Sequence, residues 1–355
     1  MRGTRPARLL GLVALLTAAG AGELRGQADE LVVEPLGLLR AGLRVEPDSS
    51  PRNTSFEIFD ARLGVQGGFG TLLEYMLHAG FNTVDDEFRL LDAVVSITPI
   101  PEFGVNVGQF KAPFSMEELL FRPDIQYESR AQAVNAIAPA RQIGASVSGA
   151  FFEERLDYEV GLFNGNGESL ENDNNSFLYG GRVQFNTIGP LNFRDEFVLQ
   201  VGGNVAFSRD SDVDLALMGR LDPAEGDLAE YSGDRLLWGL DLHTSYQGFF
   251  LDAEFLRAEL EPEPEEGPVF STSTAQGGYL QVGYQFLSGF VEGLIRYDAF
   301  EPIGEEDRDF LLVGANLYAG YNYRVEAQYV IGLHDSAPSP ELADGQFILF
   351  LQLRI

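Results

Sequence analysis

The most constraining feature of this sequence is a series of sixteen short segments in which every second residue tends to be apolar. Successive side chains of a β-strand point to opposite faces, so a period of two predicts strands rather than helices. Each segment has about ten residues, the length that a tilted strand needs to cross a bilayer. The segments are approximately 36–45, 56–68, 71–81, 88–99, 103–110, 141–152, 155–164, 177–186, 196–208, 235–246, 249–259, 273–287, 290–300, 308–319, 321–333 and 346–355.

The connections between these segments fall into two classes that alternate along the chain. One class is mostly tight and comprises 69–70, 100–102, 153–154, 187–195, 247–248, 288–289 and Gly320. The other is mostly long, polar and acidic and includes 46–55, 111–140, 165–176, 209–234, 260–272 and 334–345. An even-stranded membrane barrel requires this alternation, because short turns lie at its periplasmic end and long loops at its extracellular end. The 187–195 turn departs from the pattern, since it is longer than the 82–87 and 301–307 loops.

Residues 1–28 have the features of a cleaved secretory signal peptide. Arg2, Arg5 and Arg8 supply a positive start, and an apolar stretch follows over 9–21. Small residues permit cleavage after Ala28 or after Ala21. The alternative is a membrane anchor, but a spanning helix needs about 18 or more apolar residues.

Beyond residue 28 no apolar run is long enough for a transmembrane helix. Because only helices and closed barrels satisfy the backbone in lipid, the exported chain is either soluble or a barrel. A soluble β-sandwich has no need of short and long connections at opposite ends, and a propeller has a repeat of about forty residues, which is absent. We therefore predict an all-β fold, a 16-stranded antiparallel transmembrane β-barrel in the bacterial outer membrane.

The final segment supports this prediction. The last, third-last and fifth-last residues, Ile355, Leu353 and Leu351, are apolar. This resembles the C-terminal signal of outer-membrane proteins, although that signal usually ends in Phe. It implies the barrel assembly machinery as a partner, together with outer-membrane lipid.

Composition excludes several classes of function. The chain has no cysteine, so disulfides and thiolate metal sites are excluded. Its formal net charge of −30 argues against nucleic acid as a partner, since nucleic-acid binding requires basic surface. A hydrophobic content of 45% argues against disorder. We expect no cofactor and no metal.

If the apolar faces of the strands meet lipid, the opposite faces line the lumen. On that parity the lumen carries charges of both signs, which set selectivity where a pore is narrowest. The alternative for each charge is that it pairs with another and only keeps the lumen wet. The basic residues are Arg40, Arg44, Arg62, Arg182, Arg296, Arg324 and Arg354, and the acidic ones are Asp60, Glu74, Asp92, Asp157, Glu159, Asp241, Asp252, Glu254, Glu292, Asp298 and Glu326.

The longest connection, 111–140, contains apolar residues that are unusual for a loop in water. They include Phe114, Leu120, Ile125 and Ile137. A loop that folds back into the barrel and packs on its wall accounts for them, and long structured loops are often functional. We therefore predict that 111–140 is an inward-folded constriction loop. The alternative is a partly helical extracellular cap.

Four runs resemble the phosphate-selective porin O and P family. They are GVNVGQFKAPF at 104–114, RQIGA at 141–145, LDYEVGLFNG at 156–165 and FDARLG at 59–64, which amount to about a tenth of the chain. The piece from residue 108 to 114 is the most specific. The resemblance implies a porin domain over 29–355, usually trimeric, with inward-folded loops and an arginine-lined lumen.

Members of that family are known to bind phosphate or polyphosphate through Arg and Lys near the constriction. In this sequence the residues for such an anion contact are Lys111, Arg122, Arg130 and Arg141. Lys111 is the only lysine, and the net charge is strongly negative, so the chain departs from the family in both respects. The resemblance thus implies passive diffusion of small hydrophilic solutes and ions, with phosphate as one candidate.

The long loops between 209 and 234 and between 260 and 272 are rich in Asp and Glu. A negative vestibule repels anions over about a Debye length, ~8 Å at physiological salt. Such loops can instead bind divalent cations that bridge lipopolysaccharide, or they can form an ordinary solvated surface.

Two other functions remain open. One is a plugged structural or adhesin-type barrel. The other is an outer-membrane enzyme, but the sequence has only His78, His243 and His334 and no serine nucleophile motif beside them. We expect no enzymatic activity.

Overall fold

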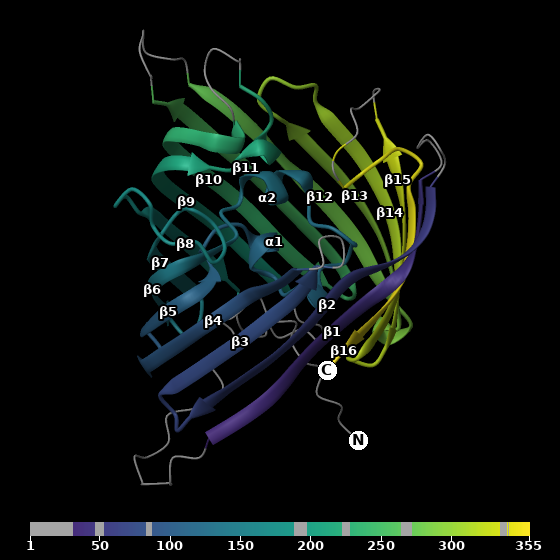
Figure 1. Cartoon of the computed structure of the whole chain (residues 1–355). Helices are drawn as coiled ribbons and strands as arrows, with labels where there is room; N and C mark the ends of the chain where they lie inside the picture. The colour runs from purple at the N-terminus through teal and green to yellow at the C-terminus, as the bar shows by residue number, and fades with distance from the viewer. Residues whose placement is uncertain are drawn as a thin grey trace.

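The computed structural model describes residues 31–46, 53–82, 87–187, 197–221, 228–263, 272–333, 339 and 341–355. The proposed signal peptide at 1–28 lies outside them. Sixteen strands form one closed barrel (Figure 1). They are β1 (Leu31–Glu46), β2 (Asn53–Phe69), β3 (Leu73–Asn82), β4 (Glu87–Ile100), β5 (Phe103–Lys111), β6 (Arg141–Phe151), β7 (Leu156–Phe163), β8 (Leu178–Asn186), β9 (Val198–Val213), β10 (Tyr231–Tyr246), β11 (Phe249–Pro262), β12 (Ser273–Phe286), β13 (Val291–Glu301), β14 (Arg308–Ala319), β15 (Tyr323–Gly332) and β16 (Phe347–Arg354).

Every strand pairs antiparallel with its neighbour in sequence, and β1 pairs with β16 to close the barrel. The closing register runs from Leu38 opposite Arg354 to Val45 opposite Phe347. Closure removes the free sheet edges, so every strand finds a backbone partner on both sides. The predicted 16-stranded antiparallel barrel is confirmed.

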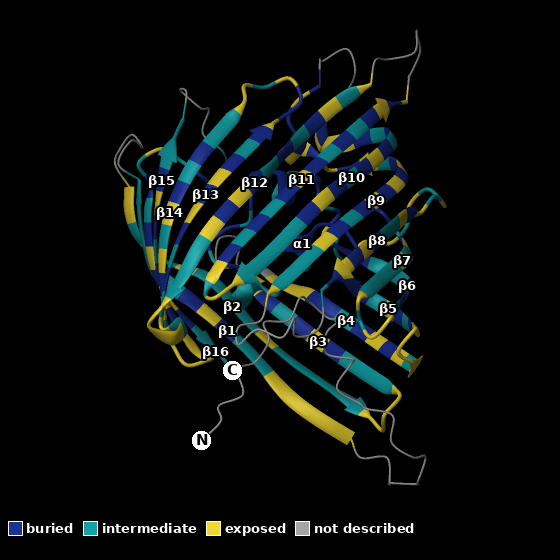
Figure 2. Ribbon diagram, turned by 180° about the vertical axis from the view of Figure 1, so that it is seen from behind, coloured by how far each residue is buried: buried dark blue, intermediate teal, exposed yellow. Residues whose placement is uncertain are grey.

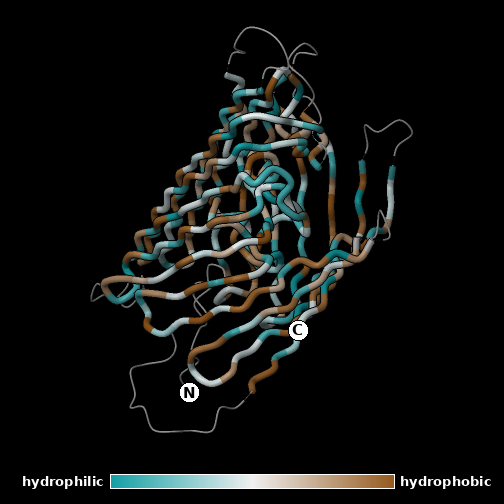
Figure 3. The backbone as a smooth tube through the Cα atoms, turned by 60° about the vertical axis from the view of Figure 1, so that its left-hand side comes forward, coloured by the Kyte–Doolittle hydropathy of each residue, from teal (hydrophilic) through white to brown (hydrophobic). Residues whose placement is uncertain are grey.

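Buried and exposed residues alternate along the strands (Figure 2), and apolar and polar residues are interleaved along them (Figure 3). On β16, Leu349 and Leu351 are 39% and 53% exposed on the outer face, whereas Ile348 and Phe350 are 0% and 1% exposed inside. The inner face therefore includes apolar residues, and Phe350 there packs against the Phe59 ring and the Arg40 guanidinium. Within the described residues, no helix is both long and apolar enough to cross a membrane.

The turns at one end of the barrel are short, as in the connection of β14 to β15 at Gly320, whose φ of 71° suits glycine. At the other end some strands extend further than the sequence pattern predicts. Strand β9 continues to Val213 and β10 begins at Tyr231, so the connection between them is shorter than the predicted 209–234. Asp210 and Asp234, assigned to that loop, are strand residues.

The connection from β5 to β6 contains the helices α1 (Met116–Leu119) and α2 (Gln132–Ile137) and the 3-10 turn η2 (Arg122–Asp124). Both helices lie within the outline of the barrel in Figure 1. The apolar residues noted in the sequence are buried here, with Phe114 and Ile125 each 1% exposed. Burial of each such side chain is worth about 1.5–3 kcal/mol. We call residues 112–140 the internal loop.

Helix α2 belongs to an apolar cluster inside the barrel, at the end where the long connections lie. Val134 and Ile137 share this cluster with Met218 of the 3-10 turn η3 (Ala216–Met218) and with Phe300 and Ile303. Backbone hydrogen bonds join Ile303 to Met218 at 2.8 Å and Arg220 to Ile303 at 2.7 Å. The segments after β9 and β13 thus meet over α2, on the β9–β13 side of the mouth. A further 3-10 turn, η4 (Leu228–Glu230), precedes β10, and η5 (Leu287–Gly289) links β12 to β13.

Candidate functional site

The internal loop begins and ends on adjacent strands but is fastened to the wall half-way round the barrel. At its start, the backbone N–H groups of Met116 and Glu117 donate to the Glu254 carboxylate of β11 at 2.9 and 3.1 Å. The Glu117 carboxylate pairs with Arg296 of β13, and both side chains are at most 2% exposed. These contacts hold α1 against β11–β13.

A second set of contacts fastens the loop to β14–β16 and β1. Tyr127 donates its hydroxyl to the Leu312 carbonyl at 3.0 Å, and the Glu128 N–H donates to Gln328 at 2.9 Å. Arg40 of β1 donates to the carbonyls of Tyr127 and Glu128 at 3.3 and 3.1 Å. The loop therefore crosses the lumen from β5–β6 to the opposite wall.

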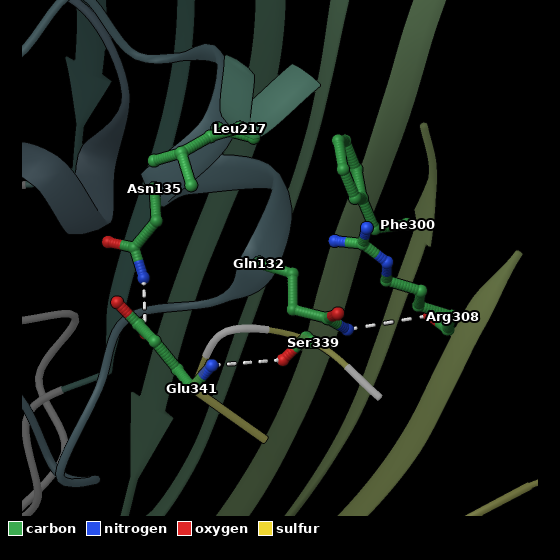
Figure 4. Close-up of a pocket in the computed structure, with 8 residues that line it drawn as sticks. Gln132, Asn135, Leu217, Phe300, Arg308, Ser339 and Glu341 are labelled. Atoms are coloured by element: carbon green, nitrogen blue, oxygen red, sulfur yellow. Dashed lines mark hydrogen bonds between the residues drawn. The ribbon is translucent and has the colours of Figure 1, made fainter. Parts of the chain in front are cut away.

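Helix α2 is held at the end of the barrel where the long connections lie, beside a small cavity of about 30 Å³ (Figure 4). Gln132 donates to Asp298 of β13 at 3.2 Å and to the Arg308 carbonyl at 3.4 Å. Asn135 donates to the carboxylate of Glu341, which lies just before β16, at 2.7 Å. A space of this size holds at most about one water, so this cavity is too small for a solute site.

The four anion-contact residues predicted from the sequence gather where the loop leaves the β5–β6 wall. Lys111, the last residue of β5, donates to the carbonyls of Glu118 and Leu120 at 2.5 and 2.7 Å. Arg130 donates to the same two carbonyls at 3.3 and 3.4 Å and pairs with the Glu118 carboxylate at 3.0 Å. Lys111 and Arg130 thus both close the loop on itself.

Arg122 reaches from the loop to strand β2. Its guanidinium lies 3.2 Å from the Asp60 carboxylate and 3.4 Å from that of Glu128. Asp60 is also held by Arg62 of the same strand, at 2.6 and 2.8 Å. Arg62, predicted only as a lumen residue, therefore belongs to the same group of charges.

Arg141 begins β6 and makes a bidentate pair with Asp92 of β4, with both hydrogen bonds at 3.0 Å. The Nδ1 atom of His78 lies 3.0 Å from the second oxygen of Asp92. Bidentate Arg–carboxylate pairs are among the strongest side-chain contacts, so this one fixes Arg141 on the wall.

Together these residues form what we call the basic cluster: Arg62, Lys111, Arg122, Arg130 and Arg141, with the carboxylates of Asp60, Asp92, Glu118 and Glu128. The five basic side chains are between 10% and 15% exposed. These five basic groups share four carboxylates, one of which, that of Glu128, also lies 3.8 Å from Arg44 of β1, so the charges of the cluster are nearly balanced.

Glu118 of α1 lies among these cations. Burial raises the pKa of the Glu118 carboxyl, but the charges of Arg130, Lys111, Arg141 and Arg62 outweigh it, and the pKa falls below the usual 4.5. The carboxylate is therefore ionised at neutral pH. Nothing in the strand pattern pointed to Glu118, because it lies in an irregular loop. The adjacent pair Glu117–Glu118 within an apolar stretch was the only available signal.

The other arginines predicted for the lumen point inward, but most of them hold structure together. Arg40, Arg296 and Arg324 are 0%, 1% and 2% exposed, so the loop and their neighbours cover them and they do not face open lumen. The remaining three pair with carboxylates: Arg44 with Glu57 at 2.9 Å, Arg182 with Asp241 at 2.5 Å and Arg354 with Asp124 at 2.7 Å.

The two histidines within the described residues lie apart. His78 contacts Asp92, His243 lies 2.5 Å from Asp252 on a different part of the wall, and His334 falls outside the described residues. Across the described part of the chain, no three His, Asp or Glu residues are placed to hold a metal ion.

Solved structures with the same fold include several outer-membrane proteins. An anion-selective porin from Comamonas acidovorans is 11% identical, with a TM-score of 0.64 over 92% of this chain and 100% of that one. OmpT of Vibrio cholerae is 13% identical, with a TM-score of 0.63 over 93% and 99%. The channel DcaP of Acinetobacter baumannii is 12% identical, with a TM-score of 0.59 over 92% and 97%. At these identities the likeness establishes the fold.

No curated protein sequence matches the chain. The model of the family described as phosphate-selective porin O and P matches residues 41–344, which is most of the chain and includes the whole basic cluster. The resemblance noted in the sequence is thereby confirmed. The chain belongs to the phosphate-selective porin O and P family and is an outer-membrane porin, a channel for small solutes.

Proposed function

We propose that this porin conducts small anions in preference to cations, past the basic cluster. The observation that carries the proposal is the meeting of five basic side chains from β2, β5, β6 and the internal loop. Residues far apart in the sequence converge there, where the loop faces the wall that carries Asp60 and Asp92.

Each of these basic groups has a partner, and this bears on how strongly an anion is held. A permeating anion exchanges part of its water for guanidinium and ammonium donors that already contact carboxylates or carbonyls. Conduction requires binding that is favourable at entry and weak enough for release. Shared carboxylates keep the binding weak, which suits passage rather than storage. Phosphate is the family's candidate solute, and arginine recognises phosphate in a bidentate manner.

The test is planar-bilayer recording on the purified, folded protein. Under a KCl gradient we expect the reversal potential to shift from zero toward the equilibrium potential of chloride. We also expect inorganic phosphate to reduce the chloride current. A reversal potential shifted toward the equilibrium potential of potassium, together with no effect of phosphate on the current, excludes the anion preference.

A plugged structural or adhesin-type barrel is the second candidate. The contacts of the loop with both walls and the apolar cluster at the mouth favour it. Conductance separates the two functions, since a plugged barrel gives no ohmic current steps in a folded preparation. We expect steps, and no enzymatic turnover.

The proposal extends to assembly and export. We propose that the mature chain begins after a cleaved signal at 1–28, is inserted through its C-terminal strand by the barrel assembly machinery and forms a homotrimer in contact with lipopolysaccharide. One of the similar solved structures is a trimer form of Vibrio cholerae OmpT. N-terminal sequencing of the mature protein and the mass of the detergent-solubilised complex test these points.

A further inference from the structure

The carboxylate of Glu118 occupies the centre of the basic cluster. It lies 3.0 Å from the Arg130 guanidinium and 3.9 Å from the Lys111 ammonium, and its side chain is 7% exposed. The other carboxylates are placed differently. Asp60 and Asp92 project from the wall strands β2 and β4, and each is already in close contact with an arginine of that wall. Glu128 lies further along the loop, near β1.

The ionised state of Glu118 depends on the same cations that a permeating anion meets. Its charge interacts with those of Arg130, Lys111, Arg141 and Arg62, four of the five basic groups. A carboxylate and a phosphate present similar oxygens to a guanidinium. Two anions within one cluster of cations compete for its donors and also repel each other.

We propose that Glu118 is a tethered counter-anion of the basic cluster, a specificity-determining residue that competes with permeating anions for Arg130 and Lys111. The inference rests on the proposed anion conduction and adds to it the residue that limits anion affinity. It also explains why the charges of the cluster are nearly balanced in this family member. The chain itself supplies one anion, the Glu118 carboxylate, to the basic groups.

We expect the loop to keep its shape when the Glu118 charge is removed, although the pair with Arg130 is lost. Lys111 and Arg130 bind the loop through the backbone carbonyls of residues 118 and 120, and these contacts do not require the carboxylate. The Glu118 N–H is held by the Ser115 hydroxyl at 3.1 Å, which is also independent of the side chain. Glu118→Gln therefore changes charge with little change of volume.

The experiment compares phosphate block of the chloride current in the wild type and in Glu118→Gln, in planar bilayers. We expect the variant to be half-blocked at roughly tenfold less inorganic phosphate, or lower still, because one charged competitor is gone. Under a KCl gradient, the reversal potential of the variant is expected to lie closer to the equilibrium potential of chloride than that of the wild type.

The matched control is Glu159→Gln. Glu159 also lies in the barrel interior, but it bonds to Ser146 at 2.6 Å rather than to a member of the cluster. This variant removes the same charge from the lumen and is expected to leave the half-blocking phosphate concentration unchanged. If phosphate block is strengthened equally in both variants, the inference is overturned, because loss of any negative charge from the lumen is then the cause.

The absence of native cysteine allows a test that does not depend on comparing separately folded variants. In Glu118→Cys, phosphate block is expected to be tight before labelling and to weaken after a thiol reagent adds a sulfonate. A neutral reagent of similar size leaves it tight. Equal weakening by both reagents indicates steric obstruction and overturns the inference.

The outcomes also separate this inference from the proposed function. Phosphate block of equal strength in the wild type and in Glu118→Gln overturns the role of Glu118 and leaves anion conduction standing. A cation-preferring current in both proteins, unaffected by phosphate, overturns the anion preference and the role of Glu118 together.

Discussion

Lys111 and Arg130 donate to the same two carbonyl oxygens, those of Glu118 and Leu120. One of them ends β5 and the other lies nineteen positions later in the internal loop, so the two cations close the first half of the loop into a ring. The two residues that we propose as anion contacts are therefore also residues that hold the loop in shape.

Lys111→Met removes one of these two donors together with its charge. We expect a noisier and larger single-channel conductance, because the loop is held less firmly. We also expect phosphate block to be weakened by roughly 10- to 100-fold, because a charged hydrogen bond is worth about 1.5–3 kcal/mol. Lys111→Arg keeps the charge and is expected to retain most of the block. Single-channel recording checks both variants, and wild-type behaviour of Lys111→Met refutes the role of this lysine.

Asp92→Asn releases Arg141 from its bidentate pair. The freed guanidinium is expected to increase anion preference, with the reversal potential moving to the chloride side. Removal of one partner of a buried pair also costs about 3–5 kcal/mol of stability. Bilayer recording and guanidinium unfolding of the same preparation measure the two effects. A shift of reversal potential toward potassium contradicts this prediction.

Arg296→Met leaves the buried Glu117 side chain of α1 without its arginine partner. We expect a loss of about 3–5 kcal/mol in the free energy of unfolding and faster proteolysis within the internal loop. Arg257→Met is the matched control, since Arg257 pairs with Glu259 where both side chains are about one-third exposed, and such pairs contribute about 0–1 kcal/mol. Equal losses in the two variants count against the anchoring role of Arg296.

The charge of Glu118 is expected to persist in mild acid. Burial raises the pKa of this carboxyl, but Arg130, Lys111 and the neighbouring arginines lower it below the usual 4.5. Its contribution to stability is thus present above pH 4.5 and is lost only as the pH falls through the lower, folded pKa. The difference in reversal potential between the wild type and Glu118→Gln should therefore be the same at pH 5 and pH 7. Convergence of the two proteins at pH 5 contradicts this expectation.

The barrel was predictable because its determinants are local and repetitive. A period of two fixes which residues share a face, and the alternation of turn lengths fixes how strands connect. The ends of strands were less accurate. Strand β9 runs on to Val213 because Asp210 finds a buried partner in Arg235 of β10, and an acidic residue in a polar stretch does not reveal such a partner.

Only part of the cluster could be predicted from the sequence. Lys111, Arg122, Arg130 and Arg141 were identified through the loop and the family resemblance, and the structure brings all four together. Their partners were not identifiable as such, because Asp60 lies 62 residues from Arg122 and Asp92 lies 49 residues from Arg141, and these pairs meet only after the barrel closes. Parity also assigned Arg40 and Arg296 to open lumen, since alternation shows which way a side chain points but not what covers it.

The internal loop is attached to walls that face each other across the barrel, through Lys111 on β5 and through the contact of Glu117 with Arg296 on β13. A hollow cylinder deforms most easily by flattening into an oval. A cross-member tied to facing walls opposes that deformation, so the loop stiffens the cross-section of the barrel as well as narrowing it. On the function proposed above, mechanical rigidity and solute selection in this porin reside in one stretch of about thirty residues between β5 and β6.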